Sequence, residues 1–294
     1  MRVRTVLGDV ASADLGVCDA HDHLFLRTPR LPGRELDDPA HAAARLRAFA
    51  GLGGRTIAHW TPYGLGRRTK ELAELSAATG VHIIAATGLH QAVHYDPGLL
   101  ARIRPGLAAL FHRELTDGPA GMIKVAGGFH GLDEHARHTM AAAAEASNAT
   151  GAPIGVHLEE GTAALDVLDL LCGSLGVPPD RVILSHLNRS PDPWIHRRAA
   201  EAGAYLCFDG PSRAHHATDW RLFDVLAALA EAGHTDRVLM GGDTTTPDTP
   251  GMPHLLRVLR PRVEAQLGRG VATAIFETNP ARALAFSGRA GGSP

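Results

Sequence analysis

The sequence contains few cysteines, the residues that form disulfides in small folds and bind structural zinc. It has only three cysteines in 294 residues, Cys18, Cys172 and Cys207, and each lies in an apolar run with no Cys-x-x-Cys spacing. This pattern excludes a disulfide framework and a cysteine-ligated zinc knuckle. It predicts three buried free thiols instead.

The sequence also lacks an excess of charge of either sign and a long apolar run. Its 29 Lys and Arg residues nearly balance 31 Asp and Glu residues, which gives a formal net charge of -2 at pH 7. This balance argues against nucleic acid and against an anionic membrane as partners. No run reaches the roughly 18 apolar residues of a membrane span, and residues 1–9 lack a signal-peptide core. We therefore expect a cytoplasmic protein that acts on a small-molecule substrate.

What the sequence does contain is a regular alternation of strand-like and helix-like segments. Hydrophobic residues make up 45% of the chain and charged residues 20%, as in an ordinary globular domain with an ample core. Eight short apolar runs alternate with helical patterns, which indicates parallel βαβ units. The fold class predicted is α/β, a single-domain (β/α)8 TIM barrel over 1–287 with a flexible tail at 288–294. The predicted strands are 16–23, 55–60, 81–88, 120–126, 153–157, 181–186, 204–208 and 237–243.

Helix start and stop signals fill the segments between these runs. Asp followed by Pro at 38–39 and at 192–193 supplies a cap and a first-turn proline, and Gly80 and Gly233 follow the ends of helical patterns. Pro261 predicts a kink in a late helix. The predicted helices are 38–50, 69–78, 97–115, 134–149, 162–175, 192–202, 219–232, 254–267 and 280–286.

Histidine is abundant, with 18 copies, and two of them end the first predicted strand. In an extended strand residues i and i+2 project from the same face, so His21 and His23 can aim both imidazoles at one metal ion while Asp22 faces away. With so many histidines a single His-x-His pair could also arise by chance. Whether His21 and His23 belong to a metal site therefore depends on the residues at the ends of the other strands.

Four further ionisable residues lie in or at the ends of later strands: Lys124, His157, His186 and Asp243. Each has an ordinary alternative, since Lys124 could extend its amine to solvent, His157 could be a core histidine and Asp243 could cap a helix. In a TIM barrel, however, the C-terminal ends of all strands meet at one rim, where the chemistry is located. Together the set supplies the nitrogen and oxygen ligands that a two-metal site needs.

With these residues in place, nearly the whole chain resembles the phosphotriesterase family of the amidohydrolase superfamily. The matching pieces, in order along the chain, are GVCDAHDHL (16–24), TPYGLGR (61–67), GMIK (121–124), GAPIGVHLEEGT (151–162), VILSH (182–186), GGD (241–243) and NPAR (279–282). A lone HxH would be a weak signal, whereas this ordered set across five strands is specific.

The resemblance implies a role for each residue. His21, His23 and Asp243 would hold a buried metal ion, His157 and His186 a more exposed one, and Lys124, carboxylated by CO2, would bridge both. Zinc is the expected metal, and manganese or cobalt would suit the same ligands. A hydroxide bridging the two ions would be the nucleophile, and Asp243 would carry its proton to the leaving group. The catalytic residues implied are thus Asp243 and Lys124.

The segments after strands six to eight are most similar to the branch that hydrolyses sugar lactones, including phosphorylated ones. Basic residues tend to follow the FDG and GDT segments in that branch, but here no lysine or arginine occurs at 244–247, and Arg213 is joined only by His215 and His216. A dianionic phosphate calls for two or more fixed cations. The expected substrate is therefore a neutral or singly charged lactone of a sugar or related hydroxy acid.

Other readings stay open beside this one. A phosphotriesterase or an amide hydrolase could use the same metal site, and a ligand receptor could retain it without turnover. Arg189, Arg213, His215, His90 and Tyr95 are the predicted substrate-binding residues.

Three further expectations concern individual residues and assembly. Asp209 is expected to orient a ligand histidine. His59 stands where relatives commonly carry aspartate, which we interpret as a local structural substitution. His94 is a further possible pocket residue. A homodimer through rim loops and outer helices is a possible assembly.

Overall fold

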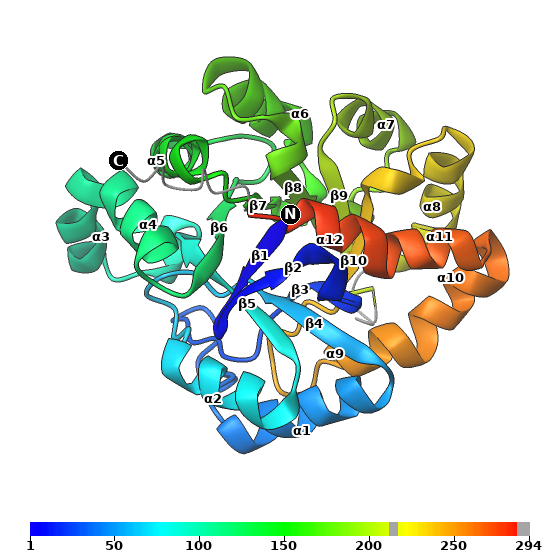
Figure 1. Cartoon of the computed structure of the whole chain (residues 1–294). Helices are drawn as coiled ribbons and strands as arrows, with labels where there is room; N and C mark the ends of the chain where they lie inside the picture. Colours follow the sequence, from blue (N-terminus) through cyan, green and yellow to red (C-terminus); the bar gives the residue numbers. More distant parts are fainter. Residues whose placement is uncertain (212–216, 287–294) are drawn as a thin grey trace, which may run out of the picture.

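Eight parallel strands form a closed barrel, as the sequence predicts. A computed structural model describes residues 1–211 and 217–286, and its main sheet has the strand order β10-β9-β8-β7-β6-β5-β4-β3 (Figure 1). The Asp243 amide donates to the His21 carbonyl oxygen at 2.9 Å, which joins the chain after β10 to β3 and closes the ring. The strands are β3 (Val17–Asp22), β4 (Gly54–His59), β5 (His82–Gly88), β6 (Ala120–Ala126), β7 (Ile154–His157), β8 (Val182–Ser185), β9 (Tyr205–Asp209) and β10 (Val238–Gly241).

Helices surround the barrel, and several begin as the sequence signals indicate. The side chains of Asp38, Asp96, Asp133 and Asp192 each accept a hydrogen bond from a first-turn amide, and three of these caps precede a proline. The helices are α1 (Pro39–Gly51), α2 (Thr69–Thr79), α3 (Pro97–Ile103), α4 (Leu107–Thr116), α5 (Glu134–Thr150), α6 (Ala164–Leu168), α7 (Pro193–Glu201), α8 (Leu222–Glu231), α9 (Gly251–His254), α10 (Arg260–Leu267), α11 (Arg269–Thr273) and α12 (Asn279–Ala283).

Some predicted helices are interrupted. The single helix predicted over 97–115 is wrong, because a 3₁₀ turn at Arg104–Gly106, which contains Pro105, separates α3 from α4. A π-helical turn, Leu255–Leu259, lies directly before the α10 residue Pro261, so the late helix is irregular at the predicted place. The segment Arg269–Thr278, which the sequence reading leaves unassigned, is helical.

An N-terminal hairpin that the sequence reading missed covers one end of the barrel. Strands β1 (Arg2–Thr5) and β2 (Gly8–Ala11) pair antiparallel, and Figure 1 shows them across the centre of the ring of helices. Val3 is fully buried in the cluster that fills the barrel interior. The Val6 amide donates to the Ile83 carbonyl oxygen at 2.9 Å, at the start of β5. The hairpin therefore closes the N-terminal end of the strands, opposite the rim where chemistry is expected.

The barrel interior is packed with apolar side chains below the rim. Trp60, Met122 and Ile183 belong to this interior cluster together with the free thiols Cys18 and Cys207. Gly155 on β7 makes room for the largest of them, since a Cβ there would lie 2.5 Å from the Trp60 ring. Among the described residues no helix is long and apolar enough to cross a bilayer. The predicted tail at 288–294 lies outside the described residues.

Candidate metal centre

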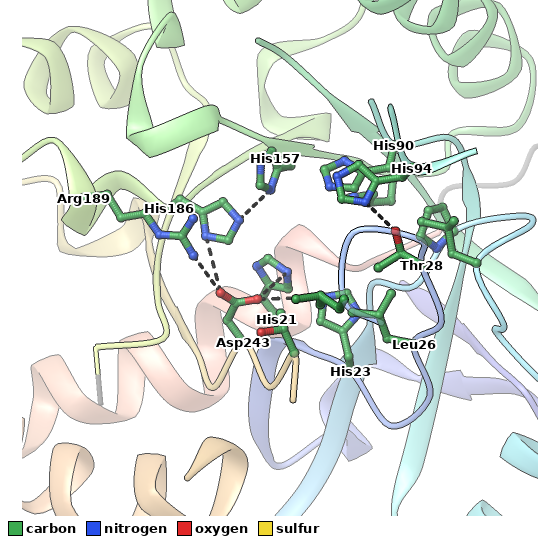
Figure 2. Close-up of a pocket in the computed structure, with 15 residues that line it drawn as sticks. His21, His23, Leu26, Thr28, His90, His94, His157, His186, Arg189 and Asp243 are labelled. Atoms are coloured by element: carbon green, nitrogen blue, oxygen red, sulfur yellow. Dashed lines mark hydrogen bonds and ion pairs between the residues drawn. The ribbon is translucent and has the colours of Figure 1, made fainter. Parts of the chain in front are cut away.

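The six residues singled out as ligands meet in one cavity at the C-terminal rim. The cavity has a volume of about 140 Å³, and His21, His23, Lys124, His157, His186 and Asp243 all line it (Figure 2). Two of them have left-handed backbone, with φ of 66° at His186 and 44° at Asp243. Such conformations cost about 1–3 kcal/mol each and concentrate at functional sites. Here they lie directly after β8 and β10, where the chain turns and the side chain joins the cluster.

Three of the buried candidate ligands, His21, His23 and Asp243, are arranged around one carboxylate oxygen. The Nε2 atoms of His21 and His23 each lie 3.8 Å from Asp243 Oδ1, and all three side chains are buried. These three residues form one of the groups that could hold a metal ion. Two imidazole nitrogens and a carboxylate oxygen at this spacing leave room for a divalent ion between them.

Hydrogen bonds behind these two histidines fix which nitrogen faces the cavity. His21 Nδ1 lies 2.8 Å from the Asp209 carboxylate, which can only accept. His23 Nδ1 lies 2.7 Å from the Thr61 hydroxyl, which already donates to the Phe25 carbonyl oxygen at 2.5 Å. Both Nδ1 atoms therefore carry the proton, and both Nε2 lone pairs are free to bind a metal.

His157 and His186 form the second half of the centre. Their facing nitrogens, His157 Nδ1 and His186 Nε2, are 2.8 Å apart. The other nitrogen of each ring contacts a carboxylate, Glu159 at 3.0 Å for His157 and Asp209 for His186. Burial lowers the pKa of His157 to about 4 and that of His186 to about 3, so both rings are neutral at pH 7. Two lone pairs then face each other, an arrangement that a cation between them would stabilise.

Lys124 lies in the same cavity and is 3% exposed. Burial lowers its pKa to about 7, although Asp243 and Glu159 act in the opposite direction. About half of its amines are therefore neutral near pH 7, and a neutral lysine amine is the form that reacts as a nucleophile. A CO2 adduct on this amine would add an anionic bridging group beside four imidazoles.

Three buried carboxylates, those of Asp19, Asp22 and Asp209, accept hydrogen bonds from the segments that carry the candidate ligands. One Asp19 oxygen accepts from the amides of His21 and Gly242, both at 3.1 Å. One Asp22 oxygen accepts from the amides of His23 and Thr244, at 2.7 and 2.8 Å. Burial and the neighbouring Asp22 raise the pKa of Asp19 well above its usual value.

Asp209 is the third carboxylate, and it contacts Nδ1 of both His21 and His186. Burial opposes its ionisation, but these two imidazoles hold its pKa well below the usual range. The geometry matches the expectation that Asp209 orients a ligand histidine, and it extends that role to two ligands.

The predicted substrate-binding residues separate into three groups. His90 and Arg189 line the cavity, as does His94 beside His90 (Figure 2). Tyr95 is not among the described residues that line it, because its hydroxyl instead accepts a hydrogen bond from the His90 amide at 2.8 Å and supports that loop. Arg213 and His215 lie outside the described residues.

The lining of the cavity combines polar and apolar side chains. The Arg189 guanidinium lies 2.8 Å from Asp243 Oδ2, the carboxylate oxygen that does not face His21 and His23. Figure 2 shows His90 and His94 on the side away from Asp243, where His94 contacts the Thr28 hydroxyl at 2.9 Å. The apolar lining comes from the loops after β3 and β4, through Leu26, Leu31, Pro62 and Leu65.

Two further residues lie at or near the site, and only one of them, His59, was singled out from the sequence; the other is Glu159. His59 is fully buried, its Nδ1 accepts from the Leu24 amide at 3.1 Å, and burial lowers its pKa to about 3. This contact agrees with the interpretation of His59 as a local structural residue. Sequence reasoning missed Glu159, although its position two residues after His157 was the available signal.

Comparisons with known proteins agree with this geometry. The model of the phosphotriesterase family matches residues 1–266. A phospho-furanose lactonase of Mycoplasmopsis synoviae is 30% identical over 329 residues, covering 96% of this chain and 91% of that protein. One from Mycoplasmopsis agalactiae is 32% identical over 248 residues, 76% of this chain and 70% of that protein. The crystal structure of a lactonase from Listeria monocytogenes superposes with a TM-score of 0.91 at 26% identity, covering 98% of this chain and all of that one (100%). The chain belongs to the phosphotriesterase family of metal-dependent hydrolases.

Proposed function

We propose that this protein opens the lactone ring of a sugar or related hydroxy acid by hydrolysis. The observation that carries the proposal is the convergence of four imidazoles, Asp243 and Lys124 in one small cavity. Relatives named phospho-furanose lactonase support the lactone as the substrate class. The proposal includes two divalent ions, with zinc expected and manganese or cobalt as alternatives.

Lys124 would hold the two ions together as a carbamate. Its neutral amine attacks CO2, an N–C bond forms and one proton is released, which turns a buried amine into an anion. The depressed pKa of Lys124 favours this reaction because the amine need not first lose a proton to bulk water. Two divalent ions, when bound here, supply Lewis-acid chemistry that activates water and polarises the ring carbonyl.

The side chains of the cavity then handle the proton and the substrate. Asp243 accepts the proton that the attacking water loses and returns it to the ring oxygen as the carbon–oxygen ester bond breaks. Arg189 holds the outer oxygen of Asp243 and so keeps the carboxylate aimed into the cavity. His90 and His94 offer polar contacts to substrate hydroxyls, while Leu26 and Leu65 cover the carbon skeleton.

A neutral or singly charged lactone fits the cavity better than a phosphorylated one. A volume of about 140 Å³ suits a single small ring. Among the described lining residues the cationic side chains are Lys124 and Arg189, and Arg189 already pairs with Asp243. A phosphate dianion would call for at least two free, fixed cations.

Metal analysis followed by a substrate panel tests the proposal. Purified protein should carry two ions per chain and hydrolyse free sugar lactones faster than phosphorylated lactones, aryl phosphotriesters or N-acyl amides. Preference for a phosphotriester or an amide would move the assignment to that class, and bound metal without turnover of any ester would indicate a receptor. About one ion per chain with an inert Lys124→Ala change would contradict the bridged site.

The biological setting remains part of the proposal. We infer a cytoplasmic enzyme whose partner is its small-molecule substrate, with a homodimer as the possible assembly. Size-exclusion chromatography with light scattering measures the oligomeric state directly.

A further inference from the structure

Glu159 occupies a position between the metal centre and the substrate side of the cavity. It follows β7 by two residues, and its carboxylate Oε2 lies 3.0 Å from His157 Nε2 and 2.8 Å from Gln91 Nε2. The side chain is 35% exposed, so it is neither a core residue nor a freely solvated one. One oxygen thus accepts from a metal-ligand candidate and from a neighbouring loop at the same time.

The contacts around Gln91 connect three successive loops of the rim. The Gln91 amide nitrogen also donates to the Gly127 carbonyl oxygen, after β6, at 2.9 Å. The Gly127 amide in turn donates to the His157 carbonyl oxygen at 2.9 Å. The loops after β5, β6 and β7 therefore share one hydrogen-bonded junction, and Glu159 is its only charged member among these contacts.

The backbone of Glu159 is fixed as well. Its carbonyl oxygen accepts from the Thr162 amide at 3.0 Å and from the Thr162 hydroxyl at 2.8 Å. The same hydroxyl accepts from the His130 amide at 2.9 Å. These contacts fix the main chain from which the Glu159 side chain reaches His157.

The position of His90, on the substrate side of the cavity, depends on the hydrogen-bonded junction formed by Gln91, Gly127 and Glu159. His90 immediately precedes Gln91 and lines the cavity, and its ring packs edge-to-face on His157 with centroids 4.6 Å apart. A shift of Gln91 would move His90, and a rotation of His157 would change the ring against which His90 packs. The orientation of the ligand ring and the position of the cavity wall are thus mechanically linked.

We propose that Glu159 is a positioning residue that fixes His157 with Nδ1 toward the more exposed metal and, through Gln91, sets the His90 side of the substrate cavity. The proposal rests on the two-metal site of the proposed function. Carboxylate partners of ligand histidines fix the ring and raise its basicity, and their loss costs about 10–100-fold in metal affinity.

Metal binding measured without substrate tests the first half. In Glu159→Ala, titration of the metal-free protein with Co2+ should show the tighter ion bound as in the wild type and the second ion bound about 10–100-fold more weakly. The visible Co2+ spectrum of the second site should change, because the ring loses its fixed orientation. Glu160→Gln is the matched control, since it removes an exposed carboxylate one residue away and should leave both affinities unchanged.

Glu159→Gln covers the case in which the alanine variant does not fold. Glutamine keeps the volume and an acceptor oxygen but loses the charge that strengthens the bond to His157. It should weaken the second ion several-fold relative to Glu160→Gln. Unchanged affinity for the second ion in every Glu159 variant that folds would overturn the proposal.

Gln91→Leu tests the second half. It removes the bridge between the loops and leaves the contact of Glu159 with His157 in place. Both ions should bind as in the wild type, while KM for the best lactone rises and kcat changes little. An unchanged KM would contradict the link to the cavity wall. Since the cobalt titration needs no substrate, failure of lactone turnover would sink the proposed function without deciding the role of Glu159.

Discussion

At the scale of single residues, the centre works through the groups that orient its ligands. Each of the four ligand histidines directs one nitrogen to the cavity because the other is bound, to Asp209, Thr61 or Glu159. Ring orientation is therefore fixed before any metal arrives. This preorganisation reduces the rearrangement that metal binding would otherwise require.

Asp243→Asn separates metal binding from proton transfer. The amide keeps an oxygen near His21 and His23 but cannot accept and return a proton at neutral pH. We expect lactone turnover to fall about 10²–10⁴-fold, the usual range for a lost general acid–base group, while most of the bound metal is retained. Steady-state kinetics with metal analysis on the same sample checks this, and unchanged turnover would rule out Asp243 as the proton carrier.

The pKa of Lys124, lowered to about 7 by burial, predicts how the metal-free protein regains activity. Only the neutral amine reacts with CO2, and its fraction falls as the pH drops below 7. At a fixed concentration of dissolved CO2, reconstitution with metal should therefore be about tenfold slower at pH 6 than at pH 8, because each unit below the pKa lowers the neutral fraction about tenfold. A recovery rate independent of pH and of the CO2 concentration would count against carboxylation.

At the scale of elements, the strands were predictable and the interruptions of the helices were predictable only in part. The apolar runs and the Asp-Pro caps located all eight barrel strands and the start of α1 and α7, because burial and capping are local signals. Pro261 marked the irregular turn in the late helix, whereas the break between α3 and α4 was missed although Pro105 lies in it.

The candidate ligand set was predictable for a similar reason, and the residues behind it less so. His21 and His157 lie in the last two residues of β3 and β7, and His186 and Asp243 follow the ends of β8 and β10, so the fold alone places them at one rim. Thr61 contacts His23 through a loop conformation that spacing does not encode, and Glu159 was marked only by its position two residues after His157. The sequence therefore gives the ligands of such a site more readily than the groups that orient them.

Gly155→Ala tests how strand β7 supports the centre. A Cβ at this position would lie 2.5 Å from the Trp60 ring, and Trp60 stacks on His21 with ring centroids 3.9 Å apart. Overpacking of this kind costs about 1–3 kcal/mol, and we expect a weaker buried metal site as well. Denaturant unfolding of the metal-free protein measures the first effect. Gly51→Ala, which has nothing within 4 Å of the added carbon, should leave stability nearly unchanged.

At the scale of the whole molecule, the two ends of the barrel have different tasks. The N-terminal hairpin closes one end (Figure 1), and the cavity of the candidate metal centre lies at the other. In this architecture the end that carries the loops after the strands bears the chemistry, and the opposite end contributes stability.

Deletion of residues 2–11 should separate these two properties. It uncovers the interior cluster around Val3 and removes the contact of Val6 with Ile83, so the thermal midpoint should fall by several degrees. The metal content and KM of the folded fraction should match those of the full chain. A loss of metal with no change in the thermal midpoint would contradict this division of roles.

Asp209 has a consequence for how the protein fills with metal. One carboxylate contacts a ligand of each half of the centre, His21 on one side and His186 on the other. The first ion to bind draws electron density from its histidine and tightens that hydrogen bond, which draws the shared carboxylate away from the other histidine. Metal uptake should therefore be stepwise, with a tighter and a weaker ion and with singly loaded molecules visible in native mass spectra. Asp209→Asn should make the two uptake steps independent. In a cell where the metal is scarce, such a protein would include a pool of half-loaded molecules.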